Sequence, residues 1–252
     1  MQVFQDYAYY YNAFYKDKDY KAEADQVHQL LQKYGNNIHS VINYGCGTGK
    51  HDVDLSALGY QCEGIDMSPE MIEIAKKSAR ESNQNITYSV ADIRKYAPSH
   101  RFDAVISLFH VMSYQNTNQD ILDAFRSVRM ALNSGGIFLF DVWYGPGVLT
   151  DLPTVRVKEV DNEAYKLVRV AKPVMYDKRN IVEVCYEVFC IDKKQDTVKM
   201  INETHSMRYF FRPELEMLLE MTGFELLDNV DCNSLKGTDY NSWTSYFIAR
   251  AV

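Results

Sequence analysis

Long hydrophobic runs, paired cysteines and an excess of positive charge are all missing from this sequence. No apolar stretch reaches the length of about eighteen residues needed to cross a bilayer, so we expect no membrane-spanning segment. With 27 basic and 34 acidic residues, the net charge of −7 disfavours a nucleic-acid partner, because phosphate binding requires concentrated Lys and Arg. The cysteines are odd in number and lack the CxxC spacing of zinc sites, which predicts a metal-free protein in a reducing compartment; they are Cys46, Cys62, Cys185, Cys190 and Cys232.

The N-terminus also lacks the features of a secretion signal. The segment MQVFQDYAYYYNAFYKDKDY has neither a basic start nor an apolar centre, so we expect a cytoplasmic protein. It is rich in tyrosine instead, with Tyr7, Tyr9, Tyr10, Tyr11 and Tyr15 in close succession. Two interpretations fit this segment equally well: a helix that packs an aromatic stripe on the body, or a segment that covers a ligand.

Strands and helices alternate along the first part of the chain. The helix over 68–82 has the clearest signals, with Ser68 as a good N-cap and Pro69 at the first helical position. The turn that starts at Asn133 (Asn-Ser-Gly-Gly) is expected to close the last helix. Short apolar runs predict buried strands at 38–44, 60–66, 86–90, 102–111 and 137–143, and helical spacing predicts helices at 19–35, 47–58, 68–82 and 121–132. This alternation predicts an α/β fold, a doubly wound and mostly parallel sheet with helices on both faces.

The pattern changes after residue 154. Period-two alternation at 165–176, 181–191 and 197–211 predicts an antiparallel meander, and a helix at 213–223 with strands at 224–230 and 243–252 returns to the earlier style. The predicted domains are an aromatic and helical cap (1–37), a core (38–151 and 212–252) and an inserted antiparallel sheet (152–211).

A glycine-rich turn follows the first predicted strand. Gly45, Gly47 and Gly49 alternate with Cys46 and Thr48, and a helix is expected next. Bare backbone at this position lets a ligand approach closely and presents amide N–H groups to it. The turn does not match the dinucleotide pattern GxGxxG or the GK[ST] ending of a P-loop. A tight packing turn would explain one glycine but hardly three.

Two acids lie at the ends of the next strands. Asp66 ends the second strand, where a carboxylate can accept hydrogen bonds from both hydroxyls of a ribose. Asp92, followed by the apolar Ile93, ends the third strand and could receive the exocyclic amine of adenine. A strand-end Asp is more often a helix N-cap, but Ser68 already has that role after Asp66.

Together these motifs resemble those of class I S-adenosylmethionine-dependent methyltransferases. The similar stretches are VINYGCGTGK (41–50), GIDMSPEMIEIAKK (64–77), VADI (90–93), FDAVISLFHVMSY (102–114) and NSGGIFLFDVW (133–143). The resemblance implies a seven-stranded Rossmann-like sheet of order 3-2-1-4-5-7-6 with an antiparallel last strand, and S-adenosylmethionine as the cofactor. It implies that Gly45, Gly47 and Gly49 line the methionine part of the cofactor. It also implies that Asp66 holds the ribose, that Met67 flanks the adenine, that Asp92 and Ile93 recognise its amine, and that Cys46, Thr48, Met71 and Leu108 belong to the same site.

Asn43 departs from this family pattern. The family usually has Asp or Glu at this position, where the acid attracts the ammonium group of the cofactor. An amide oxygen can accept the same hydrogen bond, but without the charge assistance that makes such bonds about twice as strong. We therefore expect weaker cofactor binding than an Asn43→Asp variant would show.

Three further stretches resemble sugar-nucleotide N-methyltransferases, which act on the amino group of a nucleotide-linked deoxyaminosugar. They are the Tyr-rich start followed by DYKAEA (19–24), the Trp in DVWYGPGVL (141–149) and the insert ending in ETHSMRYFFRPELE (203–216). The resemblance implies that Tyr15 and Tyr20 close over the cofactor and that the inserted sheet caps the substrate and often builds a homodimer. The alternatives are O- or N-methylation of another small metabolite and a non-catalytic protein that binds S-adenosylmethionine. Protein and nucleic-acid acceptors are disfavoured by the acidic charge.

The candidate catalytic residues are His110, Tyr15 and His205. Methyl transfer to an amine needs alignment and desolvation, and a base only to leave the nitrogen unprotonated or to deprotonate a hydroxyl. His110 follows the fourth strand, where the substrate would meet the methyl group, although a hydrogen-bonded histidine at a helix start explains it equally well.

The candidate substrate-binding residues are Tyr11, Trp143, Arg208 and Tyr209. Because side chains alternate along a strand, His205 and Tyr209 share one face, and Arg208 lies on the other. If the first face lines the cavity, His205 and Tyr209 contact the substrate, whereas the second would let Arg208 hold a phosphate or carboxylate. Trp143 is either a stacking platform for a sugar or base, or a buried core residue.

Overall fold

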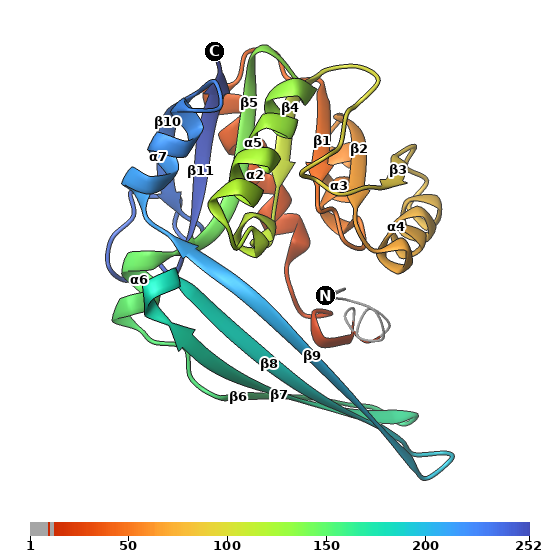
Figure 1. Ribbon diagram of the computed structural model, residues 1–252. Coiled ribbons are helices and arrows are strands. Elements are labelled where there is room, and N and C mark those ends of the chain that lie inside the picture. The colour runs from red at the N-terminus through yellow and green to blue at the C-terminus, as the bar shows by residue number, and fades with distance from the viewer. Residues whose placement is uncertain (1–9, 11–12) are drawn as a thin grey trace.

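The computed structural model describes Tyr10 and residues 13–252. Within this part of the chain, eleven strands form one mixed sheet, and helices cover both faces of its parallel region (Figure 1). The predicted fold class, a doubly wound and mostly parallel sheet with an antiparallel meander, is confirmed. No helix in the described ranges is long and apolar enough to cross a membrane.

Seven strands build the core of the sheet. They are β1 (Ser40–Tyr44), β2 (Gln61–Asp66), β3 (Thr87–Val90), β4 (Phe102–Ser107), β5 (Leu132–Tyr144), β10 (Phe224–Asp231) and β11 (Thr244–Ala251). Their order is β3-β2-β1-β4-β5-β11-β10, and only β11 runs antiparallel to its two neighbours, β5 and β10. This is the strand order that the family resemblance implied.

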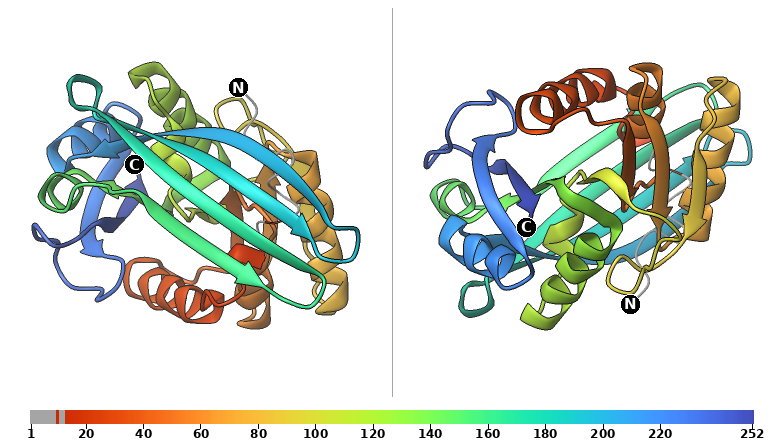
Figure 2. Two further views of the ribbon diagram at one scale, coloured as in Figure 1. Left: turned by 90° about the horizontal axis from the view of Figure 1, so that it is seen from below. Right: turned by 90° about the horizontal axis from the view of Figure 1, so that it is seen from above.

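Each face of the core sheet is covered by its own helices (Figure 2). On one face, α2 (Tyr20–Tyr34) and α3 (Lys50–Ala57) bury Val27, Leu31 and Leu55 against the sheet. On the other, α5 (Asn118–Ala131) and α7 (Arg212–Glu220) bury a second apolar cluster. The helix α4 (Pro69–Glu81) packs against β2 and β3, and Ser68 caps it as predicted, because its hydroxyl accepts a hydrogen bond from the Met71 N–H at 3.2 Å.

Two predicted boundaries are wrong. The helix expected from residue 47 begins at Lys50, because the backbone of Gly49 is left-handed and cannot belong to the helix. The expected turn after α5 is absent as a separate element, since α5 ends at Ala131 and β5 begins at Leu132. An irregularity in the pairing of β4 with β5, between Phe102 and Ala104, accommodates the extra residues of this joint.

The meander consists of four strands, one more than the sequence indicated. They are β6 (Arg156–Asp161), β7 (Tyr165–Tyr176), β8 (Ile181–Asp192) and β9 (Thr197–Phe210); α6 (Gly145–Thr150) precedes them, and the short 3-10 helix η2 (Asp177–Arg179) joins β7 to β8. The strand β5 is much longer than β4, so its last residues extend past the end of β4 and pair with β9. This joint holds the meander beside the carboxyl edge of the core strands (Figure 1).

Among the strands that the structure describes, β7 is the only one that pairs with the outer strand of the meander, β6. Exposed apolar side chains on the meander include Val157, Val174 and Val198. The homodimer expected through this sheet stays a prediction, as do the domain boundaries at residues 37, 151 and 211. A small apolar cluster, which includes Phe14 and Leu167, joins the N-terminal segment to the meander.

Candidate functional site

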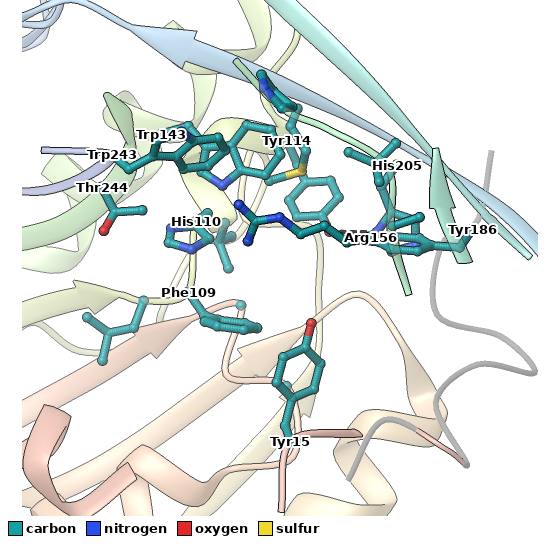
Figure 3. A pocket seen from close by; sticks show the side chains of 18 of the residues that line it. Tyr15, Phe109, His110, Tyr114, Trp143, Arg156, Tyr186, His205, Trp243 and Thr244 are labelled. Carbon is teal, nitrogen blue, oxygen red and sulfur yellow. Dashed lines mark hydrogen bonds between the residues drawn. The ribbon is translucent and has the colours of Figure 1, made fainter. Parts of the chain in front are cut away.

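A cavity of about 840 Å³ lies between the carboxyl edge of the core strands and the meander. The glycine turn, the end of β4, the N-terminal segment and strands β6 to β9 all contribute to its lining. Figure 3 shows Tyr15 with its hydroxyl directed into this space, and His110, Trp143 and Trp243 at another side of it. The predicted site residues that line it are Tyr15, Tyr20, Asn43, Gly45, Cys46, Gly47, Thr48, Asp66, Met71, Leu108, His110, Trp143 and His205.

The three glycines of the turn have different surroundings. A side-chain carbon on Gly47 would meet no atom within 4 Å, so its bare backbone faces open space in the cavity. A carbon on Gly49 would lie 2.4 Å from the hydroxyl oxygen of Tyr88, and one on Gly45 would lie 2.6 Å from Val111. Gly45 lines the cavity, whereas Gly49 does not, contrary to its predicted place beside the cofactor. The lack of a side chain at Gly49 is needed for packing against Tyr88.

Asp66 is held in place by the backbone around it. Its carboxylate accepts hydrogen bonds from the Gly47 N–H and the Ser68 N–H, both at 2.9 Å. Burial raises the pKa of Asp66, and these two backbone donors oppose the rise. The result is a fixed acceptor that lines the cavity next to the glycine turn, as a ribose site requires.

The predicted adenine-binding residues do not line the cavity. Met67 is half exposed outside it, and Ile93 packs in the core. The Asp92 carboxylate accepts hydrogen bonds from the guanidinium of Arg94, which also donates to Asp120. The Arg94 guanidinium lowers the pKa of Asp92 and occupies the oxygens that were expected to receive an amine. In this structure an amine donor would have to share the Asp92 carboxylate with Arg94.

Asn43 is buried at the end of β1 and lines the cavity. Its Nδ2 donates to Oδ1 of Asp52 on α3 at 2.6 Å, whereas its Oδ1 has no hydrogen-bond partner. Asp52 is 1% exposed, and burial raises its pKa to about 7, with the hydrogen bond from Asn43 opposing the rise. The acid that the family has at position 43 is thus absent there, but a carboxyl group lies directly behind the amide.

His110 and Asp141 form a pair at the neighbouring carboxyl ends of β4 and β5. Nδ1 of His110 lies 2.6 Å from Oδ2 of Asp141, and the His110 N–H donates to Oδ1 of the same carboxylate at 3.0 Å. The Asp141 carboxylate therefore holds the ring through this ion-pair contact and the backbone N–H, although Nδ1 makes no aligned hydrogen bond with it. Nε2 has no hydrogen-bond partner in the described part of the chain and is left for a ligand. Phe109 and His110 both have left-handed backbone, with φ of 64° and 67°. Two such residues in succession are costly and are often found at functional sites.

His205 has a different environment, although it also lines the cavity. Its Nδ1 lies 2.8 Å from the Tyr114 hydroxyl, and its Nε2 lies 3.1 Å from a Glu203 carboxylate oxygen. Both ring nitrogens are therefore engaged within the protein. This geometry suits a residue that positions Tyr114 and opposes the predicted role of His205 as a catalytic base.

The structure decides which face of β9 meets the cavity. His205 and Met207 line it, so the face that contains Arg208 is directed away. Arg208 is buried and donates to Asn118 and Glu214, which contradicts its predicted contact with a substrate anion. Tyr209 lies on the cavity-facing side of the strand but is 1% exposed, in an apolar cluster with Val148, and does not reach the cavity.

The aromatic residues at the cavity come from three parts of the chain. Trp143 from β5 contacts Trp243, with ring centroids 4.8 Å apart, and both line the cavity. The Tyr15 ring packs edge-on against Phe109 at 5.2 Å, and its hydroxyl accepts from Arg169 of the meander at 3.2 Å. These contacts suit the predicted roles of Trp143 and Tyr15, which stay predictions. Tyr11 lies outside the described residues.

The residues at the site that were not identified from the sequence include Asp52, Asp141, Arg156 and Trp243. Asp141 could have been found, because it lies near the carboxyl end of a parallel strand next to the one that precedes His110. Arg156 begins β6 and extends into the cavity, and no described residue forms an ion pair or hydrogen bond with it (Figure 3). Asp52 gave no signal, because an acid in the first turn of a helix is ordinary. Among the described residues, no group of three or more His, Cys, Asp or Glu could hold a metal ion.

Comparison with known proteins connects this geometry to an activity. Residues 41–136 match the family described as "Methyltransferase domain". The chain is 25% identical over 223 residues to dTDP-3-amino-3,4,6-trideoxy-alpha-D-glucopyranose N,N-dimethyltransferase of Streptomyces venezuelae. The aligned region covers 88% of this chain and 91% of the relative. It is 24% identical to a putative methyltransferase of Bacillus subtilis (strain 168), with 89% and 87% covered. The X-ray structure of a sugar N-methyltransferase from Streptoalloteichus sp ATCC 53650 is similar, with a TM-score of 0.82 at 20% identity and 100% and 96% covered.

Proposed function

We propose, from the premise that this chain is an S-adenosylmethionine-dependent methyltransferase, that it methylates the amino group of a nucleotide-linked deoxyaminosugar. A methyltransferase of this kind needs a site for S-adenosylmethionine, and we assign the cofactor to the part of the cavity that the glycine turn lines. The proposal concerns the acceptor, and it rests on the residues beneath the meander, together with the activity of the Streptomyces venezuelae relative.

The cavity lining fits the cofactor in two respects. Gly47 leaves open space where a side chain would intrude, and the buried Oδ1 of Asn43 lacks a hydrogen-bond partner, as an acceptor for an ammonium group should. We propose that Asn43, Gly45, Gly47 and Asp66 hold S-adenosylmethionine, which when bound supplies an electrophilic methyl group on a sulfonium. Tyr15, packed on Phe109 and hydrogen-bonded to Arg169, would exclude water from this part of the cavity.

The His110–Asp141 pair is the observation that carries the proposed chemistry. An amine acceptor is mostly protonated near neutral pH, and only its free base has the lone pair that attacks a methyl group. With its Nδ1 edge lying against Asp141 at 2.6 Å, His110 presents Nε2 as the acceptor for that proton. Asp141 orients the ring and stabilises the resulting imidazolium.

Arg156 and the two tryptophans support a nucleotide-linked acceptor. The unpaired guanidinium of Arg156 projects into the cavity, where a pyrophosphate would provide its counter-charge. The pair formed by Trp143 and Trp243 gives the same space an aromatic wall, against which a sugar or base can pack. Arg156 is exposed, so a small neutral acceptor would leave its charge to solvent and make no use of it.

A second candidate, O-methylation, is favoured by the same His110–Asp141 pair. A hydroxyl acceptor requires a base more strongly than an amine does, since it must lose its proton as the methyl group transfers. The two activities are distinguished by the atom that carries the transferred methyl group, nitrogen or oxygen.

The test is a comparison of matched acceptors. The purified protein is incubated with S-adenosylmethionine and pairs of dTDP-sugars that differ only in an amino or hydroxyl group, and the products are identified by mass spectrometry. We expect methylation of the amino member of a pair. Methylation of only the hydroxyl member would establish the second candidate, and cofactor binding without turnover on any acceptor would contradict both. Arg156→Gln is expected to weaken acceptor binding, whereas Arg179→Gln, which removes the same charge from an exposed turn of the meander, is the matched control.

A further inference from the structure

Asn43 and Asp52 form a buried polar pair, and the Tyr88 hydroxyl is a further hydrogen-bonding neighbour of Asp52. Both are almost fully buried, and they are nine residues apart, on β1 and α3. Their hydrogen bond of 2.6 Å uses the amide nitrogen of Asn43 and leaves its oxygen without a partner at the cavity. Hydrogen-bonded polar pairs are usual in protein interiors, but a buried acceptor that remains unsatisfied at a cavity lining indicates a ligand.

We propose that Asp52 is a positioning residue for the cofactor, which acts through Asn43 by directing the amide oxygen into the cavity and placing a negative charge behind it. An ionised carboxylate accepts hydrogen bonds and cannot donate them, so it selects the amide orientation in which Nδ2 faces Asp52. Oδ1 then faces the cavity, where it can accept from the ammonium group of the cofactor. The inference rests on the proposed placement of that ammonium group at Asn43.

This arrangement replaces the acid that the family has at position 43. The negative charge of Asp52 lies one amide group further from the cavity than an acid at position 43 would. It polarises the Asn43 amide, so that the amide oxygen becomes a stronger hydrogen-bond acceptor at the cavity. Adding an acid at position 43 would put two carboxyl groups in contact, and one of them would stay protonated. While Asp52 is present, Asn43→Asp therefore adds no second full charge at the cavity, and its gain in cofactor binding should be smaller than that of an acid acting alone at this position. A decisive experiment exchanges the two residues, so that the acid is at position 43 and the amide is at position 52.

The proton on Asp52 determines the orientation of the amide. The titratable groups that face Asp52 are Tyr88 from β3, Cys46 from the glycine turn and Cys62 from β2. None of them is a cation, and burial raises the pKa of Asp52 to about 7. A protonated Asp52 can donate to Oδ1 of Asn43, which turns Nδ2 toward the cavity and repels an ammonium group. Cofactor affinity is therefore expected to rise with pH through neutrality, and binding of the cation should release a proton from Asp52.

The experiment measures binding without turnover. S-adenosylhomocysteine, which has the same ammonium group, is titrated by calorimetry at several values between about pH 6 and about pH 8, in two buffers of different ionisation enthalpy. The variants are Asp52→Asn, the exchange N43D/D52N and the control Asp54→Asn, which removes a charge from the same helix away from the cavity. Thermal unfolding of each variant verifies that it is folded.

For the natural protein we expect affinity that increases with pH and a proton released near pH 7. Asp52→Asn should bind about tenfold more weakly at the upper pH and lose the Asp52-linked proton release. The exchange N43D/D52N should recover affinity to within about threefold of the natural protein, and Asp54→Asn should behave as the natural protein.

Equal affinity and equal proton release in Asp52→Asn and the natural protein would overturn the inference while leaving the proposed function intact. If the natural protein did not bind S-adenosylhomocysteine, the proposed cofactor placement would fail, and the inference with it. Should Asp52→Asn not fold, the test is the exchange variant. Loss of S-adenosylhomocysteine affinity in a folded N43D/D52N protein would contradict the proposed role of Asp52.

Discussion

Replacing Asp52 with Asn should make the stability of this protein less dependent on pH. Burial raises the pKa of Asp52 from 3.8 to about 7, so the folded protein retains a proton that the unfolded chain has already released between these values. Each tenfold change in proton affinity corresponds to about 1.4 kcal/mol, which makes the full cost of ionising the buried group about 4 kcal/mol. The sign follows from the direction of the shift: stability is highest when Asp52 is protonated, and it falls as pH rises from about 4 to about 7.

Asn has nearly the same shape as Asp and no charge to bury. Between pH 5 and pH 8, the free energy of unfolding of the variant should therefore rise relative to the natural protein by about 2.5 kcal/mol, with most of the change below pH 7. Urea unfolding followed by circular dichroism at each pH measures this difference. The control Asp196→Asn changes an exposed turn residue, at a left-handed position that Asn tolerates. A difference between Asp52→Asn and the natural protein that stays constant with pH would refute the burial of an ionisable carboxyl group at this position.

Three further predictions concern the cavity. His110→Asn, chosen because Asn tolerates the left-handed backbone, should lower kcat about 100-fold and leave S-adenosylhomocysteine affinity within about twofold; an unchanged kcat would remove His110 from the chemistry. Arg156→Gln should raise KM for a nucleotide-linked acceptor about tenfold with little change in kcat, and equal KM values would contradict the phosphate contact. Gly47→Ala should weaken S-adenosylhomocysteine binding at a stability cost of about 1 kcal/mol, whereas Gly49→Ala should cost at least about 2 kcal/mol in urea unfolding, because its new carbon would meet Tyr88; the reverse ranking would contradict the different surroundings of the two glycines.

The cofactor half of the site was largely predictable, whereas the acceptor half was not. Gly47 follows β1 and Asp66 ends β2, and the carboxyl ends of parallel strands meet at one edge, so the positions in the chain are enough to bring them together. Asp92 occupies an equivalent position, but its carboxylate pairs with Arg94, only two residues further along. A local ion pair of this kind depends on side-chain conformations that the strand pattern does not encode.

The sequence by itself determined the order of the strands and helices, the glycine turn and the insertion of an antiparallel meander, because these depend on periodicity and on turn residues close together in the chain. Only the tertiary structure decided that His110 meets Asp141, that Asn43 meets Asp52 and that Arg208 is directed away from the cavity. Each of these depends on the register of two elements and on the direction of a side chain. The family resemblance singled out Asn43 as lacking an acid, and the fold supplies one from a neighbouring helix.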